Sequence, residues 1–436
     1  MKNKYLLINR YLISLIPLSL IFSIFIADLI VSLTSIFFFF YCLFKKNYNI
    51  FNVIEFKIFI LFYLLCIIGS INSDFTIYSL TKVLPYIRFG LFIILVKYLI
   101  QNDKKFLFYF SNSILISFFI LFIGLIFQIL NIGPFTNSYL NNRYSSFFFD
   151  ELIMGSYLIK ILPISIALLF IFEKKVLIYF TVLFVSVMIL ISGERSAIIS
   201  LSIFLGFLFI FTNLLNFKKK LIGIIFLLFT SSITLFLNDD LKFRVIDKTL
   251  YQLSIIEPER DYVEFKYSDK PEKYTAIARE EFFLPLKYYL LFNTGLKIYS
   301  DHILFGSGVK TFRMLCKKDE YYLKKNYLAF KDKPDDYYEG FTGVDGCSTH
   351  PHNYYIQLLS ETGLLTTLIV FFVLCLSIFN YFKTNLFEKK IIFISIFINL
   401  FPFITTGSFF NNFISILIYL PICFIDIKKK NSTKTN

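Results

Sequence analysis

The chain has 436 residues, of which 57% are apolar, 20% are aromatic and only 17% carry a charge. Soluble globular proteins average about 45–50% apolar and about 25% charged residues, so this composition excludes a water-soluble globular chain. It also excludes disordered, collagen-like, coiled-coil and small disulfide-rich proteins. With a mean hydropathy of +0.68, the sequence predicts an all-α, polytopic integral membrane protein.

Apolar runs separated by charges or turn residues predict about twelve transmembrane helices. A helix needs about 20 apolar residues to cross a hydrocarbon core of about 30 Å. Only Ala27 and Asp28 separate the first two runs, and Lys160 lies inside the sixth. A lysine in that position indicates a helix face turned toward an internal cavity. The runs, in chain order, are 11–26, 29–44, 58–71, 84–100, 106–130, 153–172, 176–192, 196–214, 221–238, 362–381, 391–408 and 411–426.

One long polar segment, about 114 residues between the ninth and tenth runs, interrupts this pattern. Loops longer than about 12–15 residues are usually functional or disordered, and the helical patterning of Ala276–Tyr299 predicts that this one is mostly folded. The chain therefore divides into four predicted parts. They are transmembrane helices 1–9 (1–238), an extracytoplasmic loop domain (239–352), transmembrane helices 10–12 (353–426) and a cytoplasmic tail (427–436).

The charge distribution predicts the orientation of the chain in the membrane. The short segments on the side of the N-terminus hold 21 Lys and Arg against 5 Asp and Glu, whereas the long loop holds 18 against 19. Basic residues accumulate in cytoplasmic loops, so both termini are expected in the cytoplasm and the long loop outside. The net charge of +14 is then a topology signal and does not indicate nucleic-acid binding. The segments counted are 1–10, 45–57, 97–105, 173–175, 218–220, 383–390 and 426–436.

The long loop also concentrates the chemistry-bearing residues. It holds all three histidines of the chain, His302, His350 and His352, and two of the six cysteines, Cys316 and Cys347. An even pair of cysteines in an oxidising compartment predicts a disulfide. A zinc site is the alternative interpretation, but no CxxC spacing supports it. The histidines favour a reaction site that faces outward.

One segment carries a specific motif just before the tenth run. Within residues 347–367, His352 is followed by an asparagine, nine further residues and Gly363. This segment resembles the histidine motif of the O-antigen ligase and polymerase family, which ends the largest outer loop of those membrane proteins. The family often has Gly-Thr three residues after the motif glycine, where this chain has Thr366 and Thr367.

Three further segments are similar to motifs of the same family, in the same order and on the same side of the membrane. Residues 303–312, with Gly306 and Gly308, resemble its Gly-x-Gly-x-x-x-Phe turn. Arg195 lies in a Gly-x-Arg segment that opens the eighth run, and Arg143 begins an Arg-x-x-x-Phe approach to the sixth. The likeness thus covers nearly the whole chain.

The resemblance implies a GT-C-like fold and a metal-independent glycosyltransferase without a cofactor. Such enzymes move a glycan from a polyprenyl (undecaprenyl) diphosphate carrier to an acceptor hydroxyl during lipopolysaccharide or surface polysaccharide biosynthesis. The implied partners are this donor, a lipid A core or glycan acceptor, and membrane lipid. The implied location is the bacterial inner membrane, with the active site facing the periplasm. Ligase-type transfer is favoured, and polymerisation of lipid-linked repeat units is the alternative.

The reaction needs cations for the diphosphate and a base for the acceptor hydroxyl. Arginine holds phosphate oxygens in pairs and never deprotonates, so Arg88, Arg143 and Arg195 are predicted to form a diphosphate clamp. Ordinary ion pairs or snorkelling of these arginines is the alternative interpretation. Histidine has an ordinary pKa of about 6.5; the family role transfers first to His352, with His350 as the second candidate for the base.

A function from another class stays open at this stage. Twelve spans with both termini inside also describe many polysaccharide and lipid transporters. Transporters commonly contain repeated halves and broken helices near the bilayer midplane, whereas this sequence has no evident repeat and gathers its polar residues at one face. An inactive relative that only binds lipid-linked glycan is a third interpretation.

Overall fold

The computed structural model describes residues 2–135, 143–211, 286–321 and 346–427, with residues 223, 225, 229, 232, 236, 238–247, 249 and 250. Regular structure in these parts is helical throughout, without a strand. Seven of the described helices are long and apolar enough to cross a membrane, and an eighth span is formed if the bent pair at the N-terminus counts as one. The chain is therefore a polytopic α-helical membrane protein. Most of the predicted ninth run, 221–238, lies outside the described residues.

The helices follow the predicted runs in order. Those before the long loop are α1 (Lys2–Ser14), α2 (Ile16–Phe22), α3 (Ile24–Phe44), α4 (Ile54–Ile71), α5 (Thr76–Val83), α6 (Ile87–Asn102), α7 (Phe106–Ile129), α8 (Met154–Ile171), α9 (Lys175–Ser192) and α10 (Arg195–Phe211). Those of the loop and beyond it are α12 (Asp239–Lys242), α15 (Leu286–Asp301), α16 (Phe312–Leu315), α17 (Tyr354–Lys383), α18 (Phe387–Asn399) and α19 (Asn412–Cys423).

The first helix boundary differs from the sequence prediction. The chain does not break at Ala27 and Asp28 but at Ser23, whose side chain accepts a hydrogen bond from the Ile26 N–H at 3.3 Å and so caps α3. A serine oxygen in this position satisfies one of the free N–H groups of the first helical turn. Asp28 is left inside α3, where its carboxylate pairs with Arg88.

The C-terminal helices depart further from the predicted runs. Helix α17 begins at Tyr354, eight residues before the predicted run, and is broken at Gly363, where φ is 75°. Helix α18 ends at Asn399 instead of extending to residue 408, and residues 400–411 form an irregular segment. This segment contains Pro402, which cannot donate a helical hydrogen bond. Its apolar side chains made it resemble a membrane span.

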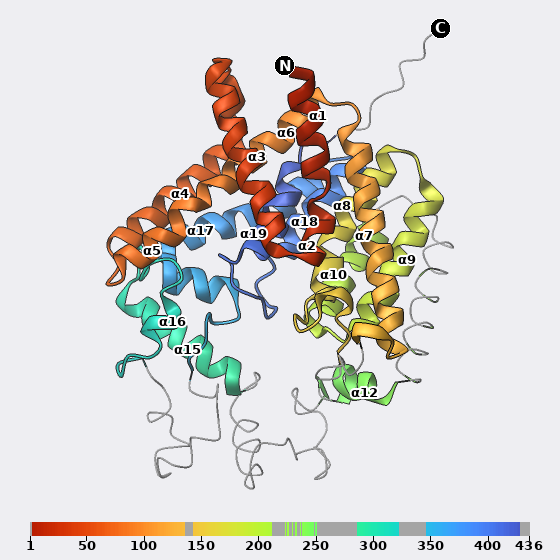
Figure 1. Cartoon of the computed structure of the whole chain (residues 1–436). Helices are drawn as coiled ribbons and strands as arrows, with labels where there is room; N and C mark the ends of the chain where they lie inside the picture. The colour runs from red at the N-terminus through yellow and green to blue at the C-terminus, as the bar shows by residue number, and fades with distance from the viewer. Residues whose placement is uncertain are drawn as a thin grey trace.

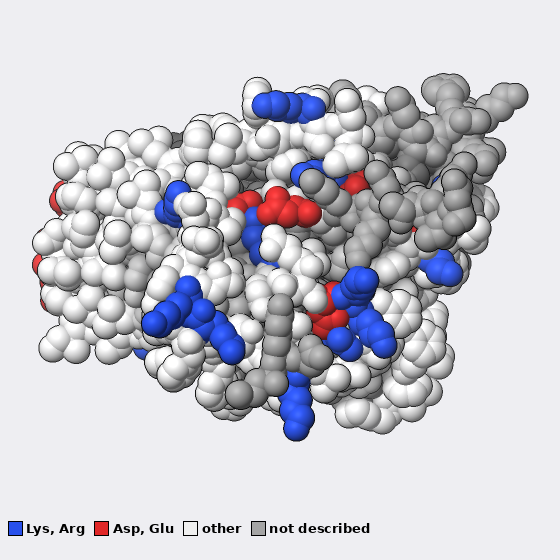
Figure 2. Space-filling model, turned by 90° about the horizontal axis from the view of Figure 1, so that it is seen from above, with Lys and Arg blue, Asp and Glu red and all other residues white. Residues whose placement is uncertain are grey.

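The arrangement of the helices places α8 in the interior (Figure 1). Of the candidate spans α8 is the most buried, because α7, α9, α10 and α18 pack around it. The N-terminus of α1 lies at one end of the molecule, and α12, α15 and α16 lie at the opposite end (Figure 1). Seen from the N-terminal end, the surface carries several separate groups of lysine and arginine side chains (Figure 2). Because four helices enclose α8, a polar side chain on this helix faces protein instead of lipid.

Candidate active site

A cavity of about 510 Å³ lies where α8 meets the loop segments. Its wall combines the segment before α8, the turn between α9 and α10, the loop helices α15 and α16, the histidine segment and the irregular segment after α18. The charged or titratable side chains that line it are Arg143, Glu151, Lys160, Glu194, Lys310, Arg313, His350 and His352. Four of these are Lys or Arg and two are Asp or Glu, so the cavity suits an anion.

The two histidines face this cavity from the segment that leads into α17. Their ring centroids are 4.2 Å apart, and the ring of His352 also meets the edge of Tyr288 of α15 at 6.0 Å. His352 has a positive φ of 57°, a backbone conformation that a non-glycine residue adopts at an energetic cost. The next residue, Asn353, fixes the segment: its side chain caps α17 and donates to the Pro402 carbonyl at 2.7 Å.

The surroundings of His350 keep its ring uncharged at neutral pH. Burial, and to a smaller extent the neighbouring His352, lower the pKa of His350 to about 4. Its Nδ1 atom shares a hydrogen bond of 2.9 Å with the Thr349 hydroxyl. A low pKa follows because a buried imidazolium would lose its hydration beside a second imidazole. His350 is therefore a neutral proton acceptor or donor in the site.

Arg143 is held at the cavity by a buried carboxylate. The guanidinium lies 3.7 Å from the carboxylate of Glu194, which is 2% exposed. The other oxygen of Glu194 accepts hydrogen bonds from the Ser156 N–H at 2.8 Å and the Ser156 hydroxyl at 2.6 Å. Burial raises the pKa of Glu194, and Arg143 and Ser156 oppose that rise. Glu194 thus connects Arg143 to the N-terminal end of α8.

Lys160 supplies a cation from within α8. It is 8% exposed, lines the cavity and donates to the Tyr354 hydroxyl at 3.1 Å. Pro163 has no N–H, so the carbonyl of Ile159, one turn earlier in α8, does not receive its usual helical hydrogen bond. Ile159 lines the same cavity as Lys160. This position agrees with the sequence-based prediction that Lys160 faces an internal cavity.

Two further cations follow the glycine turn of the loop. Lys310 and Arg313 both line the cavity, and burial lowers the pKa of Lys310 while Glu361 opposes that shift. The sequence prediction did not include either residue in the clamp. A signal was present, because both directly follow the Gly306–Gly308 turn, but spacing alone gave no direction for their side chains.

Arg88 and Arg195 are not among the residues that line the cavity, and the three-arginine clamp stays a prediction. Arg195 is nevertheless close enough to interact electrostatically with two lining residues, Arg143 and Tyr288. Arg88 is engaged elsewhere: its Nε donates to Asp28 at 3.0 Å and another nitrogen donates to the Asn412 side chain at 3.0 Å. Arg195 begins α10 and donates to the Thr249 hydroxyl at 3.5 Å. Of the three predicted arginines only Arg143 lines the cavity. The alternative Arg195–Glu194 pair is also replaced, since Glu194 pairs with Arg143.

Comparison with known families agrees with the motif reading. The model of the O-antigen ligase family matches residues 180–371. The match covers less than half of the chain, and it supports the resemblance to this family that the motifs indicate. It includes Arg195, the glycine turn, both loop cysteines and both cavity histidines, whereas Arg88 and Arg143 precede it. A comparison with curated proteins finds no match.

Close packing explains why glycines occupy the turn at 306–308 in the matched segment. Gly306 and Gly308 have φ values of 71° and 109°, and a side chain at Gly306 would collide with the backbone of Glu361. The turn instead bonds to α17, where the Ser307 and Gly308 N–H groups donate to the Ser360 and Glu361 carbonyls at 3.0 and 2.8 Å. The glycines therefore let the loop backbone approach α17 closely at its break.

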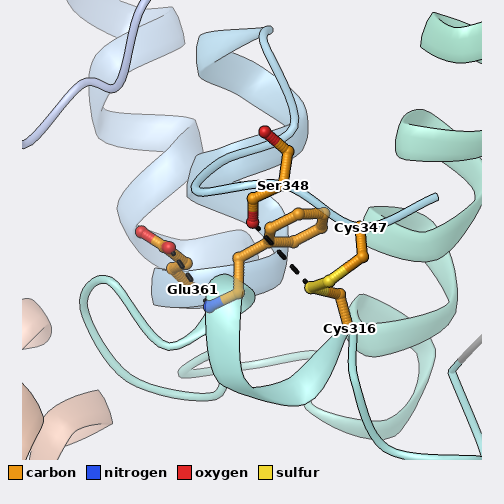
Figure 3. The surroundings of a disulfide bond; sticks show 5 residues. Cys316, Cys347, Ser348 and Glu361 are labelled. Carbon is orange, nitrogen blue, oxygen red and sulfur yellow. Dashed lines mark hydrogen bonds between the residues drawn. A yellow bond between two sulfur atoms is a disulfide. The ribbon is translucent and has the colours of Figure 1, made fainter. Parts of the chain in front are cut away.

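The predicted disulfide between Cys316 and Cys347 is present, with Cα atoms 5.1 Å apart. The Cys316 sulfur also lies 3.8 Å from the Ser348 carbonyl oxygen (Figure 3). Cys316 ends the short helix that carries Arg313, and Cys347 begins the segment that carries His350 and His352. The bridge therefore ties two lining segments of the cavity together.

The remaining sequence-based interpretations of the loop concern His302, a metal site and its helical patterning. His302 follows α15 and its carbonyl accepts from the Gly306 N–H at 3.0 Å, but it does not line the cavity. No group of three or more His, Cys, Asp and Glu side chains within the described residues is placed to hold a metal ion. The helical patterning predicted at Ala276–Tyr299 corresponds to α15 from Leu286 onward, and the rest of that stretch lies outside the described residues.

Proposed function

We propose that the chain is a ligase-type glycosyltransferase that moves a glycan from a polyprenyl-diphosphate carrier to an acceptor hydroxyl outside the cytoplasmic membrane. The observation that carries this proposal is one cavity in which two histidines meet Arg143, Lys160, Lys310 and Arg313. The O-antigen ligase match over 180–371 supports the same chemistry. A neutral glycan alone would need no such excess of cations.

The donor diphosphate is assigned to the basic side chains of this cavity. The carrier's polyprenyl tail stays in lipid, so its diphosphate must lie at the depth of the headgroups. Arg143 approaches from the segment before α8, whereas Lys310 and Arg313 approach from the loop. Fixed cations stabilise the charge that develops on the leaving diphosphate when the sugar–oxygen bond breaks. Arg88 and Arg195 support the site from outside its wall in this proposal.

His352 is assigned as the general base, with His350 as its neutral neighbour. The acceptor hydroxyl loses its proton to the imidazole of His352 as the new bond to the anomeric carbon forms. The electron pair of the broken bond leaves with the diphosphate. A protonated His350 would oppose the positive charge that forms on His352, and its low pKa avoids this.

The proposed orientation places the N-terminus inside and the loop domain 239–352 outside. The separate groups of Lys and Arg side chains at the N-terminal end (Figure 2) and the position of α15 and α16 at the opposite end (Figure 1) support this. Reporter tags at residues 46, 219 and 430 are expected to report cytoplasm, and a tag near residue 260 the outside. A cytoplasmic report from the tag near residue 260 contradicts the proposed side of the reaction.

The acceptor is tested with the purified, full-length protein in lipid vesicles. Incubation with polyprenyl-diphosphate glycan and a lipid A core acceptor is expected to yield glycosylated core and free polyprenyl diphosphate. Glycan chains that lengthen on the carrier without core would instead identify a polymerase. Movement of the lipid across the bilayer with no covalent change would identify a transporter and overturn the proposal.

A further inference from the structure

The most buried carboxylate near the site takes no part in the chemistry proposed above. Glu361 lies in α17, two residues before the break at Gly363, and is 0% exposed. Its side chain does not line the cavity. One carboxylate oxygen accepts from the Phe312 N–H at 3.3 Å, and the other accepts from the Gln357 amide at 2.9 Å. Figure 3 shows the carboxylate reaching across to the start of α16.

Gln357 extends this contact to a third segment. The nitrogen of its side chain also donates to the Ser408 hydroxyl at 2.9 Å, and its oxygen accepts from the Phe409 N–H at 2.8 Å. Gln357 itself is 1% exposed. Glu361 and Gln357 are one helical turn apart on α17, a spacing that puts them on the same face. Together they bond α17 to the start of α16 and to the irregular segment after α18.

Each of the three connected segments supplies a wall of the cavity. The turn before α16 carries Lys310 and α16 itself carries Arg313. Helix α17 begins two residues after His352, and the irregular segment contributes residues 404–408. None of these walls belongs to a continuous membrane-spanning helix, so their relative positions depend on contacts between segments. The Glu361–Gln357 contacts are buried, where hydrogen bonds to a charged group are strongest.

We propose that Glu361 and Gln357 form a positioning pair that sets the cations Lys310 and Arg313 at a fixed distance from His352. This inference rests on the proposed glycan transfer. The pair does not touch the substrates. It acts by fixing the positions of three cavity walls relative to one another. A displacement of about 1 Å between reacting groups costs about 10²-fold in rate, so these relative positions matter for transfer.

The hydrogen-bond pattern requires one carboxylate and one amide. The Glu361 carboxylate only accepts, and it faces the Phe312 N–H, the Gln357 amide and also the Lys310 N–H. Glu361→Gln keeps the shape but sets an NH₂ group against either Phe312 N–H or the Gln357 amide. Gln357→Glu alone sets two carboxylates against each other. In the double variant the new glutamine donates to the new glutamate, which still accepts from Phe409 N–H. The Ser408 hydroxyl then has to donate to residue 357 instead of accepting from it, and the contact between residues 357 and 361 is restored.

The experiment uses the full-length protein with each single variant and the double variant. Each single variant is expected to raise the KM for the donor and to lower kcat, for a combined loss of about 10²-fold in kcat/KM. The double variant is expected to recover at least tenfold of this loss. A purely structural role lowers the amount of folded enzyme and leaves KM unchanged, so a loss confined to apparent kcat overturns the proposal.

Glu388→Gln is the matched control. Glu388 is also a buried carboxylate, 2% exposed, but it lies in the first turn of α18. The adjacent Phe387 packs on Phe170 near the end of α8 that is remote from Lys160. This variant is expected to leave the KM for the donor unchanged. An equal rise in KM would show that any buried carboxylate affects transfer and would overturn the specific role of the pair.

Amide hydrogen exchange gives a readout that does not depend on activity. In the single variants residues 306–316 and 404–411 are expected to exchange faster, and in the double variant they are expected to regain protection. Single variants that transfer glycan at the wild-type rate, or a double variant no better than its parents, overturn the positioning role. A wild-type protein that transfers no glycan contradicts the proposed function instead, and the exchange data then decide alone whether the pair couples the three segments.

Discussion

The two ends of the molecule differ in how their charged side chains are arranged. At the end where α1 begins, Arg10 forms two hydrogen bonds with Asp103, at 2.7 and 2.9 Å, and Lys97 lies between Glu55 and Asp426. At the cavity end, four basic side chains share a wall with two acidic ones. Paired charges join helices and leave little field for a ligand, whereas cations in excess attract an anion.

Backbone regularity follows the same division. The ion pairs of the N-terminal end join helices or the residues that immediately follow them. The cavity wall instead includes the irregular segment after α18 and a positive φ at His352. Irregular backbone at membrane depth is tolerated where it lines a cavity or is buried in protein. Substrate-binding residues are therefore expected where the backbone is irregular, and structural ion pairs are expected where it forms regular helices.

Removal of the proposed base tests this division most severely. His352→Ala is expected to reduce glycan transfer by about 10²–10⁴-fold, the usual contribution of a general base. The initial rate of carrier release measures it in purified, well-folded protein. The control is His302→Ala, since His302 belongs to the same loop but does not line the cavity, and its rate is expected to stay at the wild-type level. Full activity of the His352 variant would transfer the role to His350.

Two paired arginines, one from each end, compare an ion pair that lines the cavity with an ion pair that joins helices. Arg143→Ala is expected to lower kcat/KM by about 10²-fold, because it removes a cation that stabilises the leaving diphosphate. Arg10→Ala removes a partner of Asp103 and is expected to lower the thermal midpoint without changing kcat/KM. Equal kinetic losses in both variants would remove the distinction between the two ends.

The disulfide holds the cavity end together where helix packing is sparse. Cys316→Ser is expected to destabilise the outer segments by about 3.7 kcal/mol, the chain-entropy value for a loop of this size, since the cysteines have a sequence separation of 31. Limited proteolysis and thermal unfolding measure the effect. Cys375→Ser replaces an exposed free cysteine and serves as the control. Unchanged stability in the Cys316 variant would show that packing alone fixes α16.

The smallest expected effect is the pH dependence that His350 introduces at the cavity end. Its pKa of about 4 lies below the ordinary value, so the folded site binds this proton less readily than the unfolded chain does. Stability is therefore complete above about pH 6.5 and falls as the pH is lowered toward 4, by at most about 3 kcal/mol. His350→Asn is expected to reduce this slope in thermal unfolding. A variant with the wild-type slope would assign the dependence to another group.

The sequence by itself determined the membrane class, the order of most spans and the segment that carries the histidine motif. Apolar runs are reliable because a membrane helix must satisfy all its backbone hydrogen bonds internally. The Cys316–Cys347 bridge was also predictable, since the other cysteines fall in apolar runs. Composition misled where apolar residues serve a loop, as in residues 400–411. It also misplaced the break at Ala27 and Asp28, which lies at Ser23, and the start of α17.

Only the tertiary structure decided which cations share the cavity with the histidines. Arg88 and Arg143 are equally plausible in the sequence, but Asp28 and Asn412 engage Arg88 from α3 and α19, whereas Glu194 holds Arg143 at the cavity. Asp28 and Asn412 lie 60 and 324 positions from Arg88 along the chain, and Glu194 lies 51 positions (194 − 143) from Arg143, so no local pattern reveals them. The direction of a long side chain depends on the nearest opposite charge in space, which helix packing sets.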